Sequence, residues 1–247
     1  SLYPDDDMMS AMVATAIVSQ SGLGDYDFMG LQKKLSGNTA KVSPYINNLH
    51  EGITGSCSPK DLETMLQLNY LYFTAIRKDE TAFNAYVSRI RNVIKPMRSN
   101  PLVIFQDTLT KIVSSFSKRV IAVPTDAQID SINLDRIMAI FRDRFADAGD
   151  FTYFMIGNFS TDSVIPLLET YLGGLPSKGR KEEWKDVEPE FPDGKVTADV
   201  PLNSEPQSRV AMIWNGDFKW KDKNRFGFAM LMNILSIKLR ESMREDQ

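Results

Sequence analysis

The sequence has only one cysteine and one histidine in 247 residues, and each scarcity excludes a kind of site. With Cys57 alone, neither an internal disulfide framework nor a zinc site built from several cysteines can form. With His50 alone, a Ser-His-Asp triad has one candidate base, and no strand-Gly-x-Ser-x-Gly-helix turn supplies the nucleophile. We expect Cys57 to be a buried, inert thiol and His50 to be a surface or hydrogen-bonded histidine of a strand pair. The residues alone therefore show no catalytic constellation.

An excess of charge and a long apolar run are also missing. The 29 Lys and Arg against 32 Asp and Glu leave a net charge of −3. The basic cluster Lys178, Arg180 and Lys181 is followed at once by Glu182 and Glu183. A nucleic-acid partner requires a broader basic face with stacking aromatics, so we expect none. No stretch of ~20 apolar residues occurs, so we expect no membrane span.

Capping residues and apolar spacing predict most of the helices. Pro4 and three aspartates open the first, which Gly22 and Gly24 end. Asp79 is positioned to cap a helix that Pro96 ends or kinks, and another helix follows Pro101. Further predicted helices run from the cap Ser58 to Arg77 and from the cap Ser160 to Tyr171, with a short one at 28–35. The clearest amphipathic spacing is that of Leu134, Ile137, Met138, Phe141 and Phe145.

Strand signals are fewer. Residues 41–47 and 49–57 alternate in part and predict an antiparallel pair. Residues 151–157 read as a buried strand, and 195–202 and 209–215 as two more. Helices and strands alternate unevenly, which favours an α+β fold with helices packed on one face of a mostly antiparallel sheet.

The composition changes between Pro176 and about Pro192, where Lys, Glu, Pro and Gly dominate. Such a stretch is typical of a linker between packed units. After it a second strand-and-helix unit begins, with Phe226, Met230, Ile234 and Ile237 on its helix. The chain ends within that helix, so we expect it to be part of a larger protein.

Several strings, in order, resemble pitrilysin/insulinase-type (inverzincin) zinc metallopeptidases. The similarity covers nearly the whole chain and rests on residues 1–24, 58–63, 142–159, 167–177 and 237–245. Such enzymes consist of four similar α+β domains in two halves around a peptide-sized chamber. Their zinc is held in the first domain by an inverted His-x-x-Glu-His helix, where a metal-bound water attacks the peptide carbonyl.

The resemblance implies a place for this chain in that layout. Where the metal motif would lie, the first helix has Met12-Val13-Ala14-Thr15-Ala16, which has neither imidazole nor carboxylate. Residues 1–176 are therefore expected to be a noncatalytic domain of the third type, lacking its opening strands. Residues 177–194 would be the linker, and 195–247 the start of a truncated fourth domain.

The implied function is that of the noncatalytic C-terminal portion of a zinc metalloendopeptidase, which closes the peptide-binding chamber. The expected partners are a peptide or small protein substrate and the N-terminal catalytic half of the same chain. Zinc would be a cofactor of the parent protein, with no metal and no catalytic residue in this portion. Among bacterial relatives a periplasmic location is common, which favours that compartment.

Arg244 is the one residue to which the resemblance gives a chemical role. In the family, an arginine at this place reaches the bound peptide near the zinc and can stabilise developing oxyanion charge. A solvated arginine at a helix end is the alternative, and Arg240 one turn earlier is expected to be a surface charge.

Two other interpretations remain open. The parent protein could be a structural or peptide-binding subunit of a peptidase-like assembly without hydrolytic activity. The chain could also be an unrelated binding domain. An upstream His-x-x-Glu-His would separate the first of these from the peptidase.

Overall fold

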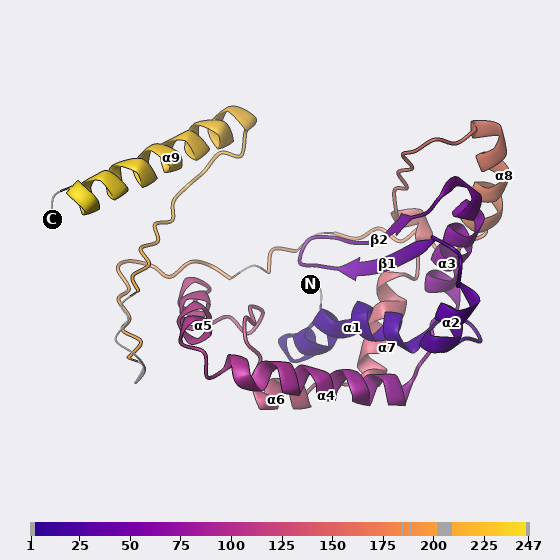
Figure 1. Ribbon diagram of the computed structural model, residues 1–247, viewed down its shortest axis with the longest axis horizontal. Helices are drawn as coiled ribbons and strands as arrows, with labels where there is room; N and C mark the ends of the chain where they lie inside the picture. Colours follow the sequence, from indigo (N-terminus) through magenta and orange to yellow (C-terminus); the bar gives the residue numbers. More distant parts are fainter. Residues whose placement is uncertain (1–2, 184, 188, 202–208, 246–247) are drawn as a thin grey trace. The chain divides into compact units, whose positions relative to one another are not determined.

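The computed structural model describes residues 3–183, 185–187, 189–201 and 209–245, and it divides into two units, residues 1–203 and 204–247 (Figure 1). The first unit contains the 3₁₀ helices η1 (Asp5–Asp7), η2 (Pro59–Asp61) and η3 (Ala148–Asp150) and the strands β1 (Lys41–Ile46) and β2 (Glu51–Ser56). Its α-helices are α1 (Met8–Ser21), α2 (Phe28–Lys34), α3 (Leu62–Thr74), α4 (Glu80–Met97), α5 (Pro101–Val113), α6 (Asp126–Asp130), α7 (Leu134–Arg144) and α8 (Thr161–Tyr171). The second unit contains α9 (Asp222–Glu245). No helix in the described ranges is long and apolar enough to cross a bilayer.

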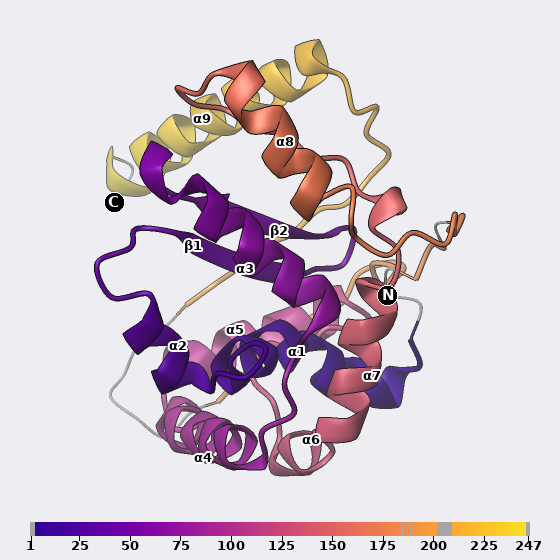
Figure 2. The same cartoon turned by 90° about the vertical axis from the view of Figure 1, so that its right-hand side faces the viewer.

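Helix α1 is the centre of the first unit. It is apolar or small around most of its circumference, which is typical of a helix buried on all sides. Ala14, Ile17 and Val18 are fully buried. Figures 1 and 2 both show α1 between the β1–β2 hairpin and α4, and it also packs along α7. Gly22 ends the helix with a φ of +83°, as predicted from the sequence.

Helix α7 has the predicted amphipathic face. Leu134, Ile137, Met138 and Phe141 are all buried on it, and Phe145 follows at its C-cap. The rings of Phe141 and Phe145 stack with their centroids 4.4 Å apart. Each fully buried aromatic or aliphatic side chain of this face contributes about 1.5–3 kcal/mol relative to an exposed one. Packing of α7 on α1 is therefore a main source of the unit's stability.

The predicted antiparallel pair is present as β1 and β2. Their register pairs Val42 with Gly55, Pro44 with Ile53 and Ile46 with Glu51, so these side chains share one face. Val42, Ile46 and Ile53 pack against the core on that face, where α1 and α3 lie. The expected arrangement of helices against an antiparallel sheet is confirmed in its coarse form, because the described fold is mostly helical with a two-stranded sheet.

Three predicted strands are wrong in the parts that the structure describes. Residues 151–157, 195–201 and 209–215 have no regular secondary structure, and Leu202 lies outside the described residues. Phe154 is 86% exposed and Ile156 is 100% exposed, so the expected burial of 151–157 is also wrong. A strand persists through its ladder partners, and none of these segments pairs with β1 or β2. Apolar alternation indicates a preference for the strand conformation, but it does not determine whether a pairing strand is present.

The three N-caps predicted from the sequence, Asp79, Ser58 and Ser160, are all in place, but only Asp79 makes the expected side-chain bond. Asp79 accepts a hydrogen bond from the Ala82 amide, as expected of an N-cap. Ser58 instead donates its hydroxyl to Asp61, at 2.6 Å, and Ser160 precedes α8 without a side-chain cap bond. The helix starts are therefore right: Ser58 and Ser160 occupy the N-cap positions of η2 and α8, but neither accepts a side-chain bond from a helix amide.

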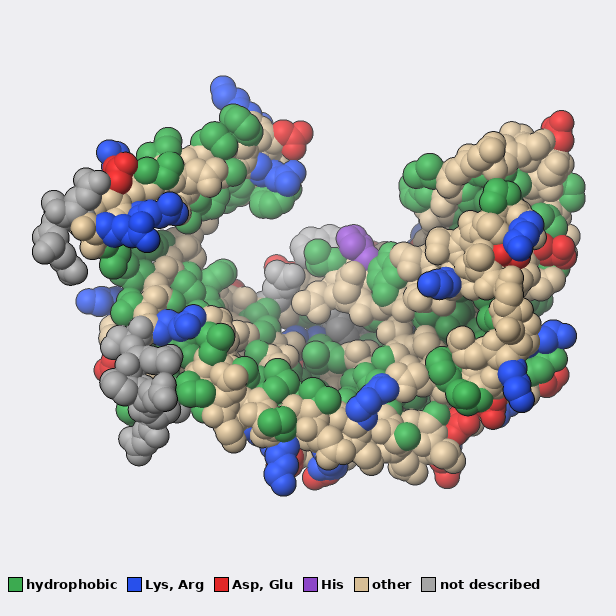
Figure 3. All heavy atoms as spheres, in the orientation of Figure 1, with side chains coloured by type: hydrophobic (Ala, Val, Ile, Leu, Met, Phe, Trp, Pro, Cys, Tyr) green, Lys and Arg blue, Asp and Glu red, His purple; other side chains and the backbone are tan. Residues whose placement is uncertain are grey.

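Helix α9 lies in the second unit, at the predicted place. Phe226, Met230, Ile234 and Ile237 are between 42% and 69% exposed, and Figure 3 shows apolar side chains along the helix. Close to its start, Arg225 lies over the Trp220 ring, 4.8 Å from its centroid. The apolar face predicted from the spacing is thus present, and its side chains are exposed in the described part of this unit.

Candidate functional site

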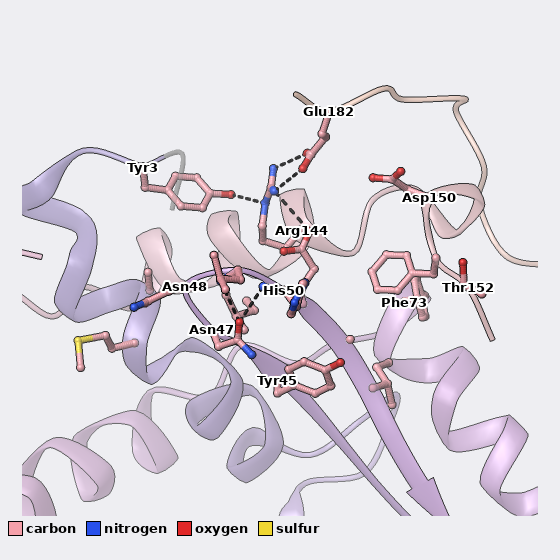
Figure 4. A pocket seen from close by; sticks show the side chains of 18 of the residues that line it. Tyr3, Tyr45, Asn47, Asn48, His50, Phe73, Arg144, Asp150, Thr152 and Glu182 are labelled. Carbon is pink, nitrogen blue, oxygen red and sulfur yellow. Dashed lines mark hydrogen bonds and ion pairs between the residues drawn. The ribbon is translucent and has the colours of Figure 1, made fainter. Parts of the chain in front are cut away.

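The first unit contains a cavity of about 680 Å³ beside the β1–β2 hairpin. Figure 4 shows Tyr45, Asn47 and His50 of the hairpin on one side, with Phe73, Asp150 and Thr152 on another. Its lining comes from Tyr3, the hairpin, α1, α3, the end of α7, residues 150–154, and the side chains of Glu182, Glu183 and Lys185. Its size is in the range of ligand pockets, about 300–1,000 Å³.

A charged cluster forms one wall of this cavity, centred on Arg144 at the end of α7. Arg144 is 9% exposed, and its two Nη atoms each lie 2.8 Å from an oxygen of Glu182. The same guanidinium contacts Asp143 at 2.9 Å and Glu51 at 3.4 Å. A buried guanidinium requires such partners because removal from water is costly. The two-pronged bond to Glu182 is the most specific of these contacts.

Tyr3 completes the cluster from the start of the chain. Its hydroxyl donates to Asp143 and accepts from Nε of Arg144, and the Arg144 guanidinium lies 5.6 Å from its ring centroid. Burial, followed by the bond to Asp143, raises the pKa of Tyr3 to about 12. Burial also acts to raise the pKa of Asp143, but hydrogen bonds from Tyr3 and Arg144 outweigh it, and the net pKa is lowered. At neutral pH Tyr3 is thus a neutral donor beside an ionised carboxylate.

The first residues of the predicted linker are tied to the first unit. Asp147 accepts the Arg180 amide at 2.6 Å, and the Ala148 amide donates to the Pro176 carbonyl at 2.8 Å. The amides of Arg180, then Lys178, lower the pKa of Asp147 to about 2. Together with the Glu182 ion pair, these bonds fix residues 176–182 against the end of α7.

His50 and Cys57 flank strand β2, within the strand pair predicted from the sequence. His50 is exposed at the turn of the hairpin, where its carbonyl accepts from the Asn47 amide at 2.9 Å, and it lines the cavity. Its side chain is the purple group in Figure 3. Cys57 follows β2 and is half-buried, and burial, with Asp61 nearby, raises the pKa of its thiol. A thiol with a raised pKa is a poor nucleophile at neutral pH.

The residues that the structure describes do not fit a zinc ion. Helix α1 presents Met12, Val13, Ala14, Thr15 and Ala16 where the resemblance would place the metal motif, and none of them ligates zinc. Within the described ranges, no group of three or more His, Cys, Asp or Glu side chains could hold a metal.

Arg244 lies in the second unit, in the last turn of α9, and is exposed. The cavity of the first unit thus contains none of the residues to which the sequence assigned a substrate role. Sequence reasoning missed the pairing of Arg144 with Glu182. The acid–base string at 142–144 and the charges at 180–183 were visible signals, but their pairing joins residues far apart in the chain.

Comparison with known proteins finds similarity to peptidases. Residues 131–247 match the family described as the peptidase M16 inactive domain. The chain is 25% identical over 250 aligned residues to a probable zinc protease PqqL of Haemophilus influenzae, covering 98% of this chain and 26% of that protein. It is 26% identical over 119 residues to a zinc protease PQQL-like protein of Arabidopsis thaliana, covering 47% of this chain and 12% of that one.

Solved structures share the fold. The periplasmic protease PqqL of Escherichia coli matches 76% of this chain and 21% of its own, with a TM-score of 0.65 and 17% identity. The ferredoxin protease FusC, solved as a variant in complex with Arabidopsis ferredoxin, matches 74% of this chain and 21% of its own, with a TM-score of 0.60 and 15% identity. The chain spans about a quarter of the length of the Haemophilus relative. The resemblance to the pitrilysin/insulinase-type zinc metallopeptidases is thereby confirmed, through the match of residues 131–247 to the peptidase M16 inactive domain and the similarity to the Haemophilus protein.

Proposed function

We propose that this chain is a noncatalytic C-terminal portion of a zinc metalloendopeptidase, which closes a peptide-binding chamber and contributes contacts to the substrate. The observation that carries the proposal is the match of residues 131–247 to the inactive domain of M16 peptidases. The metal-free character of α1 supports it, because Met12–Ala16 offers no ligand for zinc.

In this proposal residues 1–176 form a third-type domain, 177–194 the linker and 195–247 the beginning of a fourth domain. The bonds that fix residues 176–182 would then set the direction in which the chain leaves the third domain. Zinc and the residues that activate water would belong to the N-terminal half of the parent protein. The substrates would be peptides or small proteins.

A periplasmic location belongs to the same proposal. It is supported by the Escherichia coli structure, whose protein is described as a periplasmic protease. Fractionation of cells that express the longer protein tests this location, and recovery in the cytoplasmic fraction would contradict it.

The experiment that tests the function compares the isolated chain with the longer protein that contains it. Each is assayed for hydrolysis of a quenched fluorescent peptide library and for bound zinc by metal analysis. We expect chelator-sensitive hydrolysis and about one zinc per molecule in the longer protein, and neither in the isolated chain. Zinc-dependent hydrolysis by the isolated chain would overturn the proposal. A longer protein that binds peptide without hydrolysis would instead favour a peptide-binding subunit.

A further inference from the structure

Residues 209–221 lead into α9 without regular secondary structure, and every one of them is exposed. Within this segment lie Asn215 and Gly216, the only asparagine–glycine pair in the sequence of 247 residues. In the described part of the chain, neither the Asn215 side chain nor the Gly216 amide takes part in a hydrogen bond. The side-chain amide and the backbone amide of the pair therefore lack a partner that would hold them in place.

An asparagine can react with the backbone amide that follows it. The nitrogen of that amide lies within reach of the side-chain carbonyl carbon, and its attack is easiest where the next residue is glycine, because no Cβ stands in the way. A hydrogen bond from the same amide in a helix or a strand ladder would hold the nitrogen away from this carbon. At Gly216 neither obstacle exists among the described residues, and a Cβ built there would meet nothing within 4 Å.

We propose that Asn215 is a site of spontaneous deamidation, with water as the co-reactant. The Gly216 nitrogen attacks Cγ of Asn215, a new C–N bond forms, and Nδ2 leaves as ammonia together with the proton of the Gly216 amide. Water then adds to either carbonyl of the resulting succinimide ring and opens it, which gives aspartate or isoaspartate. The reaction needs no oxidant or reductant, and the inference does not rest on the proposed function.

Other asparagines of the described chain lack this combination. Asn224 lies in the first turn of α9, where its Nδ2 donates to the Lys219 carbonyl at 2.8 Å. The amide that follows it, of Arg225, donates to the Lys221 carbonyl at 2.9 Å and is held by that bond. The reaction should therefore select Asn215 over Asn224, although both belong to the same unit.

The products differ from asparagine in charge and, for one of them, in backbone. Either product adds a negative charge, close to Asp217, to a chain whose net charge is −3. Isoaspartate also lengthens the main chain by a methylene group, which breaks the alternation of side chains that a strand requires. Ageing of the chain thus gives forms that differ at the end of segment 209–215, immediately before the residues that lead into α9.

Incubation of the folded chain at mildly alkaline pH tests the proposal. We expect tandem mass spectrometry to find a gain of about 1 Da at Asn215 over several days, divided between aspartate and isoaspartate. Asn224 should react at least about tenfold more slowly, because the bonds of its helix must open first. No gain at Asn215, or a rate no higher than that at Asn224, would overturn the proposal.

Concentrated guanidinium chloride separates protection by the fold from the reactivity of the sequence itself. Because the fold leaves Asn215 without protection, we expect its rate to rise by less than about threefold on denaturation, whereas the rate at Asn224 should rise further. A larger rise at Asn215 would mean that the folded chain shields the pair, which contradicts the proposal.

Gly216→Ala and Gly227→Ala are a matched pair of variants. Among the described residues a Cβ would meet nothing within 4 Å at either position, and neither glycine has a positive φ, so both variants should keep the circular dichroism of the natural chain. Gly216→Ala places a Cβ beside the attacking nitrogen, and we expect the rate at Asn215 to fall at least about tenfold. Gly227→Ala, within α9, should leave that rate unchanged. Equal rates in the two variants would overturn the attack by the Gly216 nitrogen.

Discussion

Arg144 and Glu182 form a two-pronged ion pair, with both nitrogen–oxygen distances at 2.8 Å, across 38 positions of the chain. The pair joins the end of α7 to the segment 176–182. Its partners Tyr3 and Glu51 come from the beginning of the chain and from β2. Four separate segments thus meet at one guanidinium.

Glu182→Gln should therefore destabilise the first unit. The change leaves a largely buried guanidinium without its main counter-charge, and we expect a loss of about 1–3 kcal/mol in the free energy of unfolding. Urea denaturation followed by circular dichroism measures it. Glu183→Gln is the matched control, because this exposed neighbour has no ion pair in the described residues. Equal midpoints for the two variants would show that the pair contributes nothing.

Acid should weaken the fold through Asp61 and Asp147. Hydrogen bonds from Ser58 and Thr39 lower the pKa of Asp61 to about 2, and backbone amides do the same for Asp147. The pKa of an aspartate in the unfolded chain is about 3.9, so both carboxylates stabilise the fold above that pH. This stabilisation is lost as the pH falls towards about 2.

The double variant Asp61→Asn and Asp147→Asn tests this pH dependence. We expect it to be less stable than the natural chain at neutral pH, and to lose less stability between about pH 5 and about pH 2. Urea midpoints at each pH provide the comparison. Parallel curves for the two proteins would mean that other groups control acid unfolding.

Phe141→Ala should remove much of the packing between α7 and its neighbours. The side chain is fully buried and stacks on Phe145, so we expect a loss of about 3–5 kcal/mol. Arg142→Ala, at the exposed next position, should change stability by no more than about 0.5 kcal/mol. Thermal unfolding of both variants measures the contrast, and similar losses would argue against the described face of α7.

Arg244→Ala tests the proposed substrate role in the longer protein. If Arg244 donates to developing oxyanion charge, kcat should fall by about 100-fold with a smaller change in KM. Arg240→Ala, one turn earlier on α9, should leave both parameters nearly unchanged. A fall confined to KM would restrict Arg244 to binding, and an unchanged kcat/KM would leave it as a solvated helix-end residue.

The sequence predicted elements whose causes are local. The spacing of Leu134 to Phe141 predicted α7, Gly22 predicted the end of α1, and Asp79 predicted the start of α4, because each signal acts within a few residues. The match to the inactive M16 domain likewise agrees with a resemblance carried by short strings. The domain boundaries and the role of Arg244 stay predictions.

Features that depend on distant partners were not predictable in the same way. The segment 151–157 has the composition of a strand, but its conformation depends on whether another strand pairs with it. The pairing of Arg144 with Glu182 depends on the path of the intervening residues. The hydroxyl of Ser58 donates to the side chain of Asp61 and does not accept a hydrogen bond from a helix amide. In each case tertiary context overrode a local preference.

The backbone at Gly22 limits which residues position 22 can accept. Its φ of +83° disfavours any side chain, and a Cβ there would also lie 2.2 Å from the Tyr26 carbonyl oxygen. Gly37 has nearly the same backbone angle, yet a Cβ there would meet nothing within 4 Å. In a saturation library, position 37 should accept asparagine or aspartate, while position 22 should return glycine alone.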